Sequence, residues 1–220
     1  MDGAVAACAV QCVVEPGSTG IGGDSFCLYA PNGTDQVVAF NGSGKAPAAA
    51  TIDFYEDQGI KKFERSSPHS VTIPGAVDAW SKLLTDHGRM SLSDVLQPAI
   101  AYAHDGYPIS SRVQYDWTAS KPLIAREEST ANIFLINGEV PKVGQMHNQR
   151  KLADTLQLIA ENGRDAFYRG EVAEDIVHYL QEKGGLHTLD DFSNTNGNYV
   201  TPITTRYHGH VVHECPPNGQ

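Results

Sequence analysis

The sequence predicts an α/β fold: a layered αββα sandwich of helices and antiparallel strands, with a helical insertion. Three observations predict this class. Small and apolar residues recur at helical spacing over residues 2–14. Two apolar runs, 25–30 and 36–41, flank a short turn segment, which indicates a β-hairpin. Helical patterns then dominate residues 76–187 before extended chain returns, an order typical of α/β proteins with antiparallel strands.

We expect one domain, because no internal repeat, low-complexity tract or linker interrupts the chain. A length of 220 residues with 40% hydrophobic residues is enough for a sizeable core. The expected parts are a helix and hairpin sheet in residues 1–75, a mainly helical block in 76–187 and returning strands in 188–220.

Charge and hydropathy exclude two kinds of partner. Sixteen basic residues against 26 acidic ones give a formal net charge of −10, and no basic cluster exceeds Lys61-Lys62, so we expect no nucleic acid. The longest apolar run, Ala4–Val14, is interrupted by Gln11 and is too short to span a membrane. No basic segment precedes it, so it is not a signal peptide.

The four cysteines, Cys8, Cys12, Cys27 and Cys215, contain no CxxC pair. Cys8 and Cys12 are four residues apart, a spacing that suits two small residues in a helix core. We therefore predict reduced thiols, which favour a cytoplasmic setting.

Both ends of the chain resemble interior sequence. The first helical pattern begins at Met1-Asp2 without a cap, and residues 216–220 form a turn directly after a strand pattern. We expect these residues to be part of a longer polypeptide.

The first 41 residues predict a helix and a hairpin in detail. Helix 2–14 should pack closely on a sheet through an apolar face that includes Cys8. The Asn32-Gly33 centre predicts a two-residue type I′ turn. Both strands are apolar at successive positions, so we expect both faces of the hairpin to be covered.

The helical block has clear start and stop signals. A short strand at 70–73 should lead into a helix that ends at Gly88. Ser91 and Asp94 predict a capping box on a short helix. Pro98 predicts the start of a second helix. Further predictions are a weak helix over 110–121, mostly loop over 122–144 and a helix from Asn148 to Gly163. A helix from Glu171 to Gly184 should have Val172, Ile176 and Leu180 inward, followed by a turn capped by Thr188 and extended chain at 199–206 and 210–215.

The glycine-rich stretch 13–26 is the strongest candidate for a site-forming loop. Gly20, Gly22 and Gly23 resemble a phosphate-binding loop only superficially, because such a loop follows a strand and precedes a helix, whereas this one joins a helix to a strand. We interpret it either as a tight structural turn or as one wall of a site for another kind of ligand.

Other candidate residues favour structural roles. His208 and His210 share one face of a strand and His213 points to the other, so we predict no metal site. Ser43 lacks the spacing of a nucleophile elbow. We expect carboxylates beside glycine turns, such as Asp24, to bond free backbone N–H groups.

Six segments occur in the order in which they occur in the γ-glutamyltransferase (γ-glutamyltranspeptidase) family, and the chain resembles that family along most of its length. The resemblance rests on residues 1–6, 14–26, 46–51, 70–75, 97–100 and 165–170.

The resemblance implies an N-terminal nucleophile hydrolase. Its precursor cleaves itself into a large and a small subunit, and the newly exposed threonine attacks a γ-glutamyl amide, with its own α-amine as base. Backbone N–H groups hold the oxyanion. The chain resembles only the inner part of the large subunit, so the threonine lies outside it. No cofactor is implied, the expected partner is the small subunit, and we expect these 220 residues alone to be inactive.

The resemblance also assigns a substrate-binding segment, Asn41–Lys45, near the loop of Gly20, Gly22 and Gly23. Family members specific for γ-glutamyl groups carry an arginine there that binds the substrate α-carboxylate, and the matching residue here is Ser43. A hydroxyl cannot replace a bidentate guanidinium. Either Lys45 supplies the charge, or the protein resembles relatives that act on other amides, such as β-lactam acylases and oxamate-type amidohydrolases. A non-catalytic binding protein on this scaffold is the third alternative.

Overall fold

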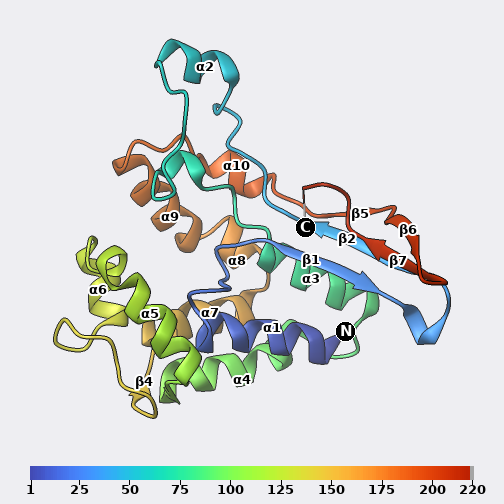
Figure 1. The fold of residues 1–220 in the computed structure, drawn as a ribbon, viewed down its shortest axis with the longest axis horizontal. Helices are drawn as coiled ribbons and strands as arrows, with labels where there is room; N and C mark the ends of the chain where they lie inside the picture. The colour runs from blue at the N-terminus through green and yellow to red at the C-terminus, as the bar shows by residue number, and fades with distance from the viewer. Residues whose placement is uncertain (219–220) are drawn as a thin grey trace. The chain divides into compact units, whose positions relative to one another are not determined.

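The computed structural model (Figure 1) describes residues 1–218. These residues divide into two compact units. The first unit combines Met1–Gly20 with Arg89–Glu161, and the second combines Ile21–Gly88 with the described residues from Asn162 onward. Helices occur in both units, and the second also holds a three-stranded sheet, so the predicted α/β class is confirmed.

The first unit is built on α1 (Asp2–Val14) and α4 (Leu92–Asp105), which pack against each other. Val5, Ala9 and Val13 are buried on α1, and the Asp2 carboxylate accepts the Arg89 N–H at 2.9 Å. The helix lies where it was predicted, but the prediction for Cys8 was wrong, because this thiol is exposed. The rest of the unit comprises β3 (Tyr107–Pro108), α5 (Ser111–Ile124), α6 (Glu128–Phe134), β4 (Met146–His147) and α7 (Arg150–Asn162), of which only the last residue lies in the second unit.

Helix α4 corrects the prediction of two helices. The capping box of Ser91 and Asp94 is present, but the helix continues through Pro98 to Asp105. A proline removes one backbone hydrogen bond. Burial of Leu96, Ala99 and other residues of this face offsets that loss.

Between Pro122 and Gly144 the prediction of a loop was also incomplete, because α6 forms there. Helix α5 continues to Ile124, past Pro122. The helix predicted after Asn148 is confirmed as α7, and it is followed by Gly163 at φ 74°.

The second unit contains the predicted hairpin. Strands β1 (Ser25–Tyr29) and β2 (Val38–Gly42) pair antiparallel, and β5 (Asn198–Val200) pairs with the other edge of β2. Helix α3 (Ala76–His87) packs on β1 and β2, as Figure 1 shows. Its Val77 and the Phe40 side chain of β2 are both fully buried, which places the core of this unit between helix and sheet.

Two details of the predicted hairpin were wrong. The connection is a longer loop that contains the 3₁₀ turn η1 (Pro31–Gly33), so it is not a two-residue type I′ turn. The hairpin is also covered on only one face, because Phe26 is 37% and Leu28 is 41% exposed. Exposure alternates along β1, so one of its faces is apolar and open to solvent.

The remaining elements of this unit match the predictions in part. Residues 70–73 are not a strand, because the 3₁₀ turn η2 (Pro68–Ser70) occupies their start. On α9 (Glu171–Glu182) the buried residues are Ala173, Val177 and Leu180, so the predicted inward position is confirmed for Leu180 and was wrong for Val172 and Ile176. The Thr188 cap and the closing strands are confirmed. The other elements are α2 (Ile52–Asp57), α8 (Asp165–Tyr168), α10 (Leu189–Ser193), β6 (Ile203–Tyr207) and β7 (His210–Glu214).

Candidate functional site

The segment Asn41–Lys45 leaves the sheet at the end of β2, where the Asp24 carboxylate holds it. Oδ1 of Asp24 accepts the Gly44 N–H at 2.8 Å, and Oδ2 lies 3.3 Å from the Ser43 hydroxyl oxygen. The Asn41 side-chain oxygen accepts the Ser43 N–H at 3.0 Å. The expectation that Asp24 bonds backbone N–H groups is therefore confirmed, and Asn41, Ser43 and Asp24 form one connected group.

Three glycines let the backbone at this site pack without intervening side chains. A Cβ on Gly44 would overlap the Ile73 carbonyl oxygen, and one on Gly75 would overlap that of Gly42. The Ile73 N–H also donates to the Lys45 carbonyl at 2.9 Å. Residues 42–45 and 73–75 are therefore in direct backbone contact, a closeness that glycine allows.

The glycine loop joins the same structure through Gly23. Its carbonyl accepts the N–H groups of Gly75 at 3.0 Å and Ala76 at 2.9 Å, at the start of α3. Gly22 lies in open space, and Gly20 is the last residue of the first unit's opening segment. Of the three predicted loop glycines, Gly23 is thus the one that makes hydrogen bonds to this part of the site.

Lys45 lies next to this group in sequence but does not join it. Its side chain is exposed, and within residues 1–218 its ammonium makes no ion pair. The Asn41 side-chain amide group donates a hydrogen bond to the side-chain oxygen of Asn218 at 2.9 Å. The segment and Asp24 together therefore present one neutral amide, one hydroxyl and one carboxylate, which are linked through Ser43.

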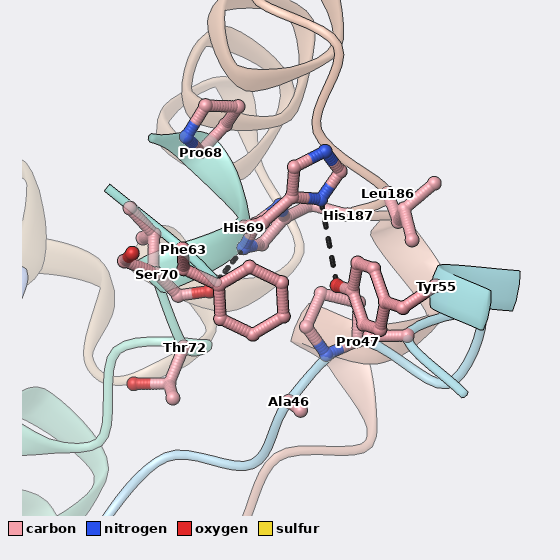
Figure 2. A pocket seen from close by; sticks show the side chains of 12 residues that line it. Ala46, Pro47, Tyr55, Phe63, Pro68, His69, Ser70, Thr72, Leu186 and His187 are labelled. Carbon is pink, nitrogen blue, oxygen red and sulfur yellow. Dashed lines mark hydrogen bonds between the residues drawn. The ribbon is translucent and has the colours of Figure 1, made fainter. Parts of the chain in front are cut away.

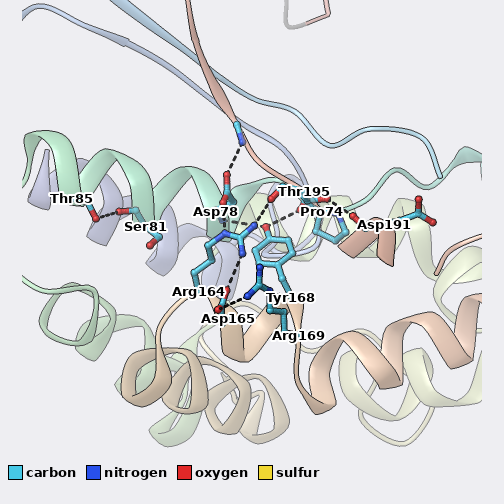
Figure 3. A network of polar contacts seen from close by, with 11 residues as sticks. Pro74, Asp78, Ser81, Thr85, Arg164, Asp165, Tyr168, Arg169, Asp191 and Thr195 are labelled. Atoms are coloured by element: carbon cyan, nitrogen blue, oxygen red, sulfur yellow. Dashed lines mark hydrogen bonds and ion pairs between the residues drawn. The ribbon is translucent and has the colours of Figure 1, made fainter. Parts of the chain in front are cut away.

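An ion pair between the buried Asp78 and the half-buried Arg164, missed at the sequence level, supports the start of α3 (Figure 3). Asp78 is 5% exposed, and its carboxylate bonds the Arg164 guanidinium. Its second oxygen accepts the Gly197 N–H at 2.7 Å, while Arg164 also donates to the Thr195 carbonyl. The pair therefore connects α3, the start of α8 and the segment that leads into β5.

Tyr168 completes this support. Its hydroxyl donates to the Pro74 carbonyl at 2.8 Å and accepts the Asp78 N–H at 3.1 Å, while the Arg164 guanidinium lies 4.4 Å from the ring centre. Burial raises the pKa of Tyr168 above its ordinary value, so the hydroxyl stays protonated. Tyr168 thereby fixes the turn that contains Gly75. A sequence signal existed, since Tyr168 lies in one of the family-like segments, but no role was assigned to it.

A cavity of about 160 Å³ borders the chain directly after Lys45 (Figure 2). His187 lines this cavity and is 1% exposed. Its Nε2 donates to the Val71 carbonyl at 2.9 Å, whereas its buried Nδ1 has no hydrogen-bond partner within residues 1–218. Burial lowers the pKa of His187, so it is neutral at pH 7. The lining residues are Ala46, Pro47, Ala50, Tyr55, Phe63, Pro68, His69, Ser70, Val71, Thr72, Leu186 and His187.

The other candidate chemistries find no support in the described residues. Among them no cluster of His, Cys, Asp and Glu could hold a metal ion, and His208 lies in the β6–β7 turn at φ 48°. Cys8, Cys12, Cys27 and Cys215 form no disulfide within residues 1–218. Within residues 1–218, every helix is too short or too polar to span a bilayer.

Comparison with known proteins connects this geometry to a family. The sequence matches the Gamma-glutamyltranspeptidase family over residues 1–220. It is 41% identical over 219 residues to the Glutathione hydrolase-like YwrD proenzyme of Bacillus subtilis, covering 100% of this chain and 42% of that protein. The chain thus spans less than half the length of this relative.

Solved structures of related enzymes have the same fold as this chain. A cephalosporin acylase from Bacillus halodurans is similar with a TM-score of 0.91 and 34% identity, over 99% of this chain and 41% of that one. Helicobacter pylori gamma-glutamyltranspeptidase is similar with a TM-score of 0.90 and 29% identity, over 99% of this chain and 63% of that one. The fold is therefore that of these N-terminal nucleophile hydrolases. The chain belongs to the gamma-glutamyltranspeptidase family.

Proposed function

We propose that this chain is the inner part of the large subunit of a self-processing amidohydrolase, and that Asn41–Lys45 forms one wall of its acyl-binding site. The nucleophile would be the N-terminal threonine of a small subunit outside the chain. That threonine would attack the amide carbon and expel the amine, and the resulting acyl-enzyme ester would then pass to water or to an acceptor amine.

The observation that carries this proposal is the construction of the Asn41–Lys45 segment. This short polar segment is fixed at the end of β2. It is held by backbone contacts through Gly42, Gly44 and Gly75 and by the hydrogen bonds to Asp24. Fixed polar groups at such a position can orient an acyl chain without contributing the nucleophile. The open face of β1, with Phe26 and Leu28 exposed, is in turn a surface for the small subunit.

Ser43 favours a second candidate within the same chemistry, an amidohydrolase that acts on amides other than γ-glutamyl ones. One neutral hydrogen bond in place of a bidentate charged pair costs about 1.5–3 kcal/mol of substrate binding, which is tenfold or more in selectivity. The similarity to a cephalosporin acylase agrees with this candidate.

Expression of the complete precursor tests the proposal. We expect two chains on a denaturing gel, the smaller with an N-terminal threonine, and turnover of at least one of glutathione, a glutaryl amide and oxamate. The separately expressed 220-residue chain should not hydrolyse a γ-glutamyl anilide above the blank. An uncut precursor without amidase activity would instead support the non-catalytic binding protein.

In the processed enzyme, Lys45→Ala tests whether this exposed ammonium binds the substrate carboxylate. A loss of about tenfold in kcat/KM for a γ-glutamyl substrate is expected if it does. An unchanged kcat/KM would exclude Lys45 from that role.

A further inference from the structure

The carboxylate of Asp24 lies against the proposed acyl-binding wall. It bonds both Ser43 and Gly44, at 3.3 Å and 2.8 Å, and its side chain is otherwise exposed. Within residues 1–218 Asp24 has no ion-pair partner. The wall is therefore negatively charged at Ser43, where a guanidinium would make it positive.

The two bonds leave Asp24 able to receive a ligand. Each carboxylate oxygen can accept two hydrogen bonds, and here each accepts one. The Ser43 hydroxyl has a single proton and an alternative acceptor, the Gly44 carbonyl oxygen at 3.3 Å. When the proton turns to Gly44, Oδ2 of Asp24 is free for a cationic donor.

From this geometry we propose that Asp24 determines substrate charge, so that the enzyme prefers acyl groups with an ammonium, and without a carboxylate, at the atom next to Ser43. This inference rests on the proposed function and names its substrate class. A substrate carboxylate bound to the Ser43 hydroxyl would lie next to the Asp24 carboxylate, which contacts the same hydroxyl. Two negative charges this close repel each other strongly. An ammonium there would gain a charge-assisted hydrogen bond. Within residues 1–218 the exposed Lys45 ammonium makes no ion pair with Asp24, so it does not neutralise the charge in direct contact with Ser43.

Three p-nitroanilides of equal chain length isolate this effect in the processed, complete enzyme. The 4-aminobutyryl compound carries the ammonium only, the γ-glutamyl compound carries ammonium and carboxylate, and the glutaryl compound carries the carboxylate only. We expect kcat/KM to fall by about tenfold or more from the first to the second, and again from the second to the third.

Asp24→Asn keeps an oxygen for the Gly44 N–H and removes the charge. It should reduce the ratio of 4-aminobutyryl to glutaryl kcat/KM by about tenfold or more. The matched control is Asp35→Asn, the same charge change at an exposed position in the loop between β1 and β2, and it should leave that ratio unchanged.

A measurement on the unaltered enzyme makes the test independent of folding of the variant. Free 4-aminobutyrate should inhibit at a concentration at least tenfold below that of glutarate. A preference for the glutaryl or γ-glutamyl compound, or an unchanged ratio in Asp24→Asn, would overturn the inference and leave the proposed function intact. Absence of both self-cleavage and turnover of all three anilides would overturn the proposed function, and the inference with it.

Discussion

The Tyr168 hydroxyl should be one of the most stabilising single groups in the second unit, and Tyr168→Phe tests this. The substitution removes two hydrogen bonds and leaves the Asp78 N–H and the Pro74 carbonyl without that partner in a buried environment. Each neutral bond contributes about 0.5–1.5 kcal/mol, and an unsatisfied buried polar group costs about 1–3 kcal/mol. We expect a loss of about 2–4 kcal/mol in the free energy of unfolding.

Urea unfolding of the chain, followed by far-UV circular dichroism, measures this loss, and hydrogen exchange at residues 76–79 locates it. Tyr115→Phe is the matched control, because Tyr115 is 69% exposed and should change stability by less than about 0.5 kcal/mol. A loss below about 0.5 kcal/mol in Tyr168→Phe would refute the view that this hydroxyl fixes the first turn of α3.

Three further perturbations probe the site and its support. Gly44→Ala should lower the free energy of unfolding by more than about 3 kcal/mol, because its Cβ would overlap the Ile73 carbonyl. The control Gly59→Ala, in open space at φ 66°, should lower it by only about 1–2 kcal/mol. Equal losses in urea melts would contradict the close backbone contact. Arg164→Met leaves Asp78 as an unpaired buried charge and should cost about 3–5 kcal/mol, and a stability like that of wild type would show that the pair contributes little. Burial lowers the folded-state pKa of His187 below its ordinary 6.5, so the unfolded chain binds more protons and stability should fall as pH drops from about 7.5 through 6.5 towards that lowered pKa. His187→Gln should make this decline shallower in melts at a series of pH values, and an identical pH dependence would exclude His187 as a source.

Local signals predicted much of the fold. The capping boxes at Ser91 and Thr188 and the glycines after α3 and α7 act within a few residues, so their sequence pattern is sufficient to locate helix ends. The errors arose where distant contacts decide. Burial against α1 carries α4 through Pro98, and the loop between β1 and β2 adopts a 3₁₀ turn that its dipeptide composition did not indicate.

The site was predictable in part for the same reason. The family resemblance pointed to Asn41–Lys45 as a substrate-binding segment, which stays a prediction. A general rule for carboxylates beside glycines predicted the backbone bond of Asp24, which is confirmed. The pairing of Asp78 with Arg164 spans 86 residues, and no sequence spacing identifies such a contact. The contact of Asp24 with Ser43, on which the expected charge preference depends, also requires the fold.

Trapping the acyl-enzyme tests the central claim, that Asn41–Lys45 forms the acyl-binding wall of a self-processing amidohydrolase. We would determine a crystal structure of the processed enzyme after reaction with the preferred anilide. The account predicts an acyl group esterified to the N-terminal threonine of the small subunit, with a polar atom within hydrogen-bond distance of Asn41, Ser43 or Asp24. An acyl group bound to that threonine but directed away from all three residues would contradict it.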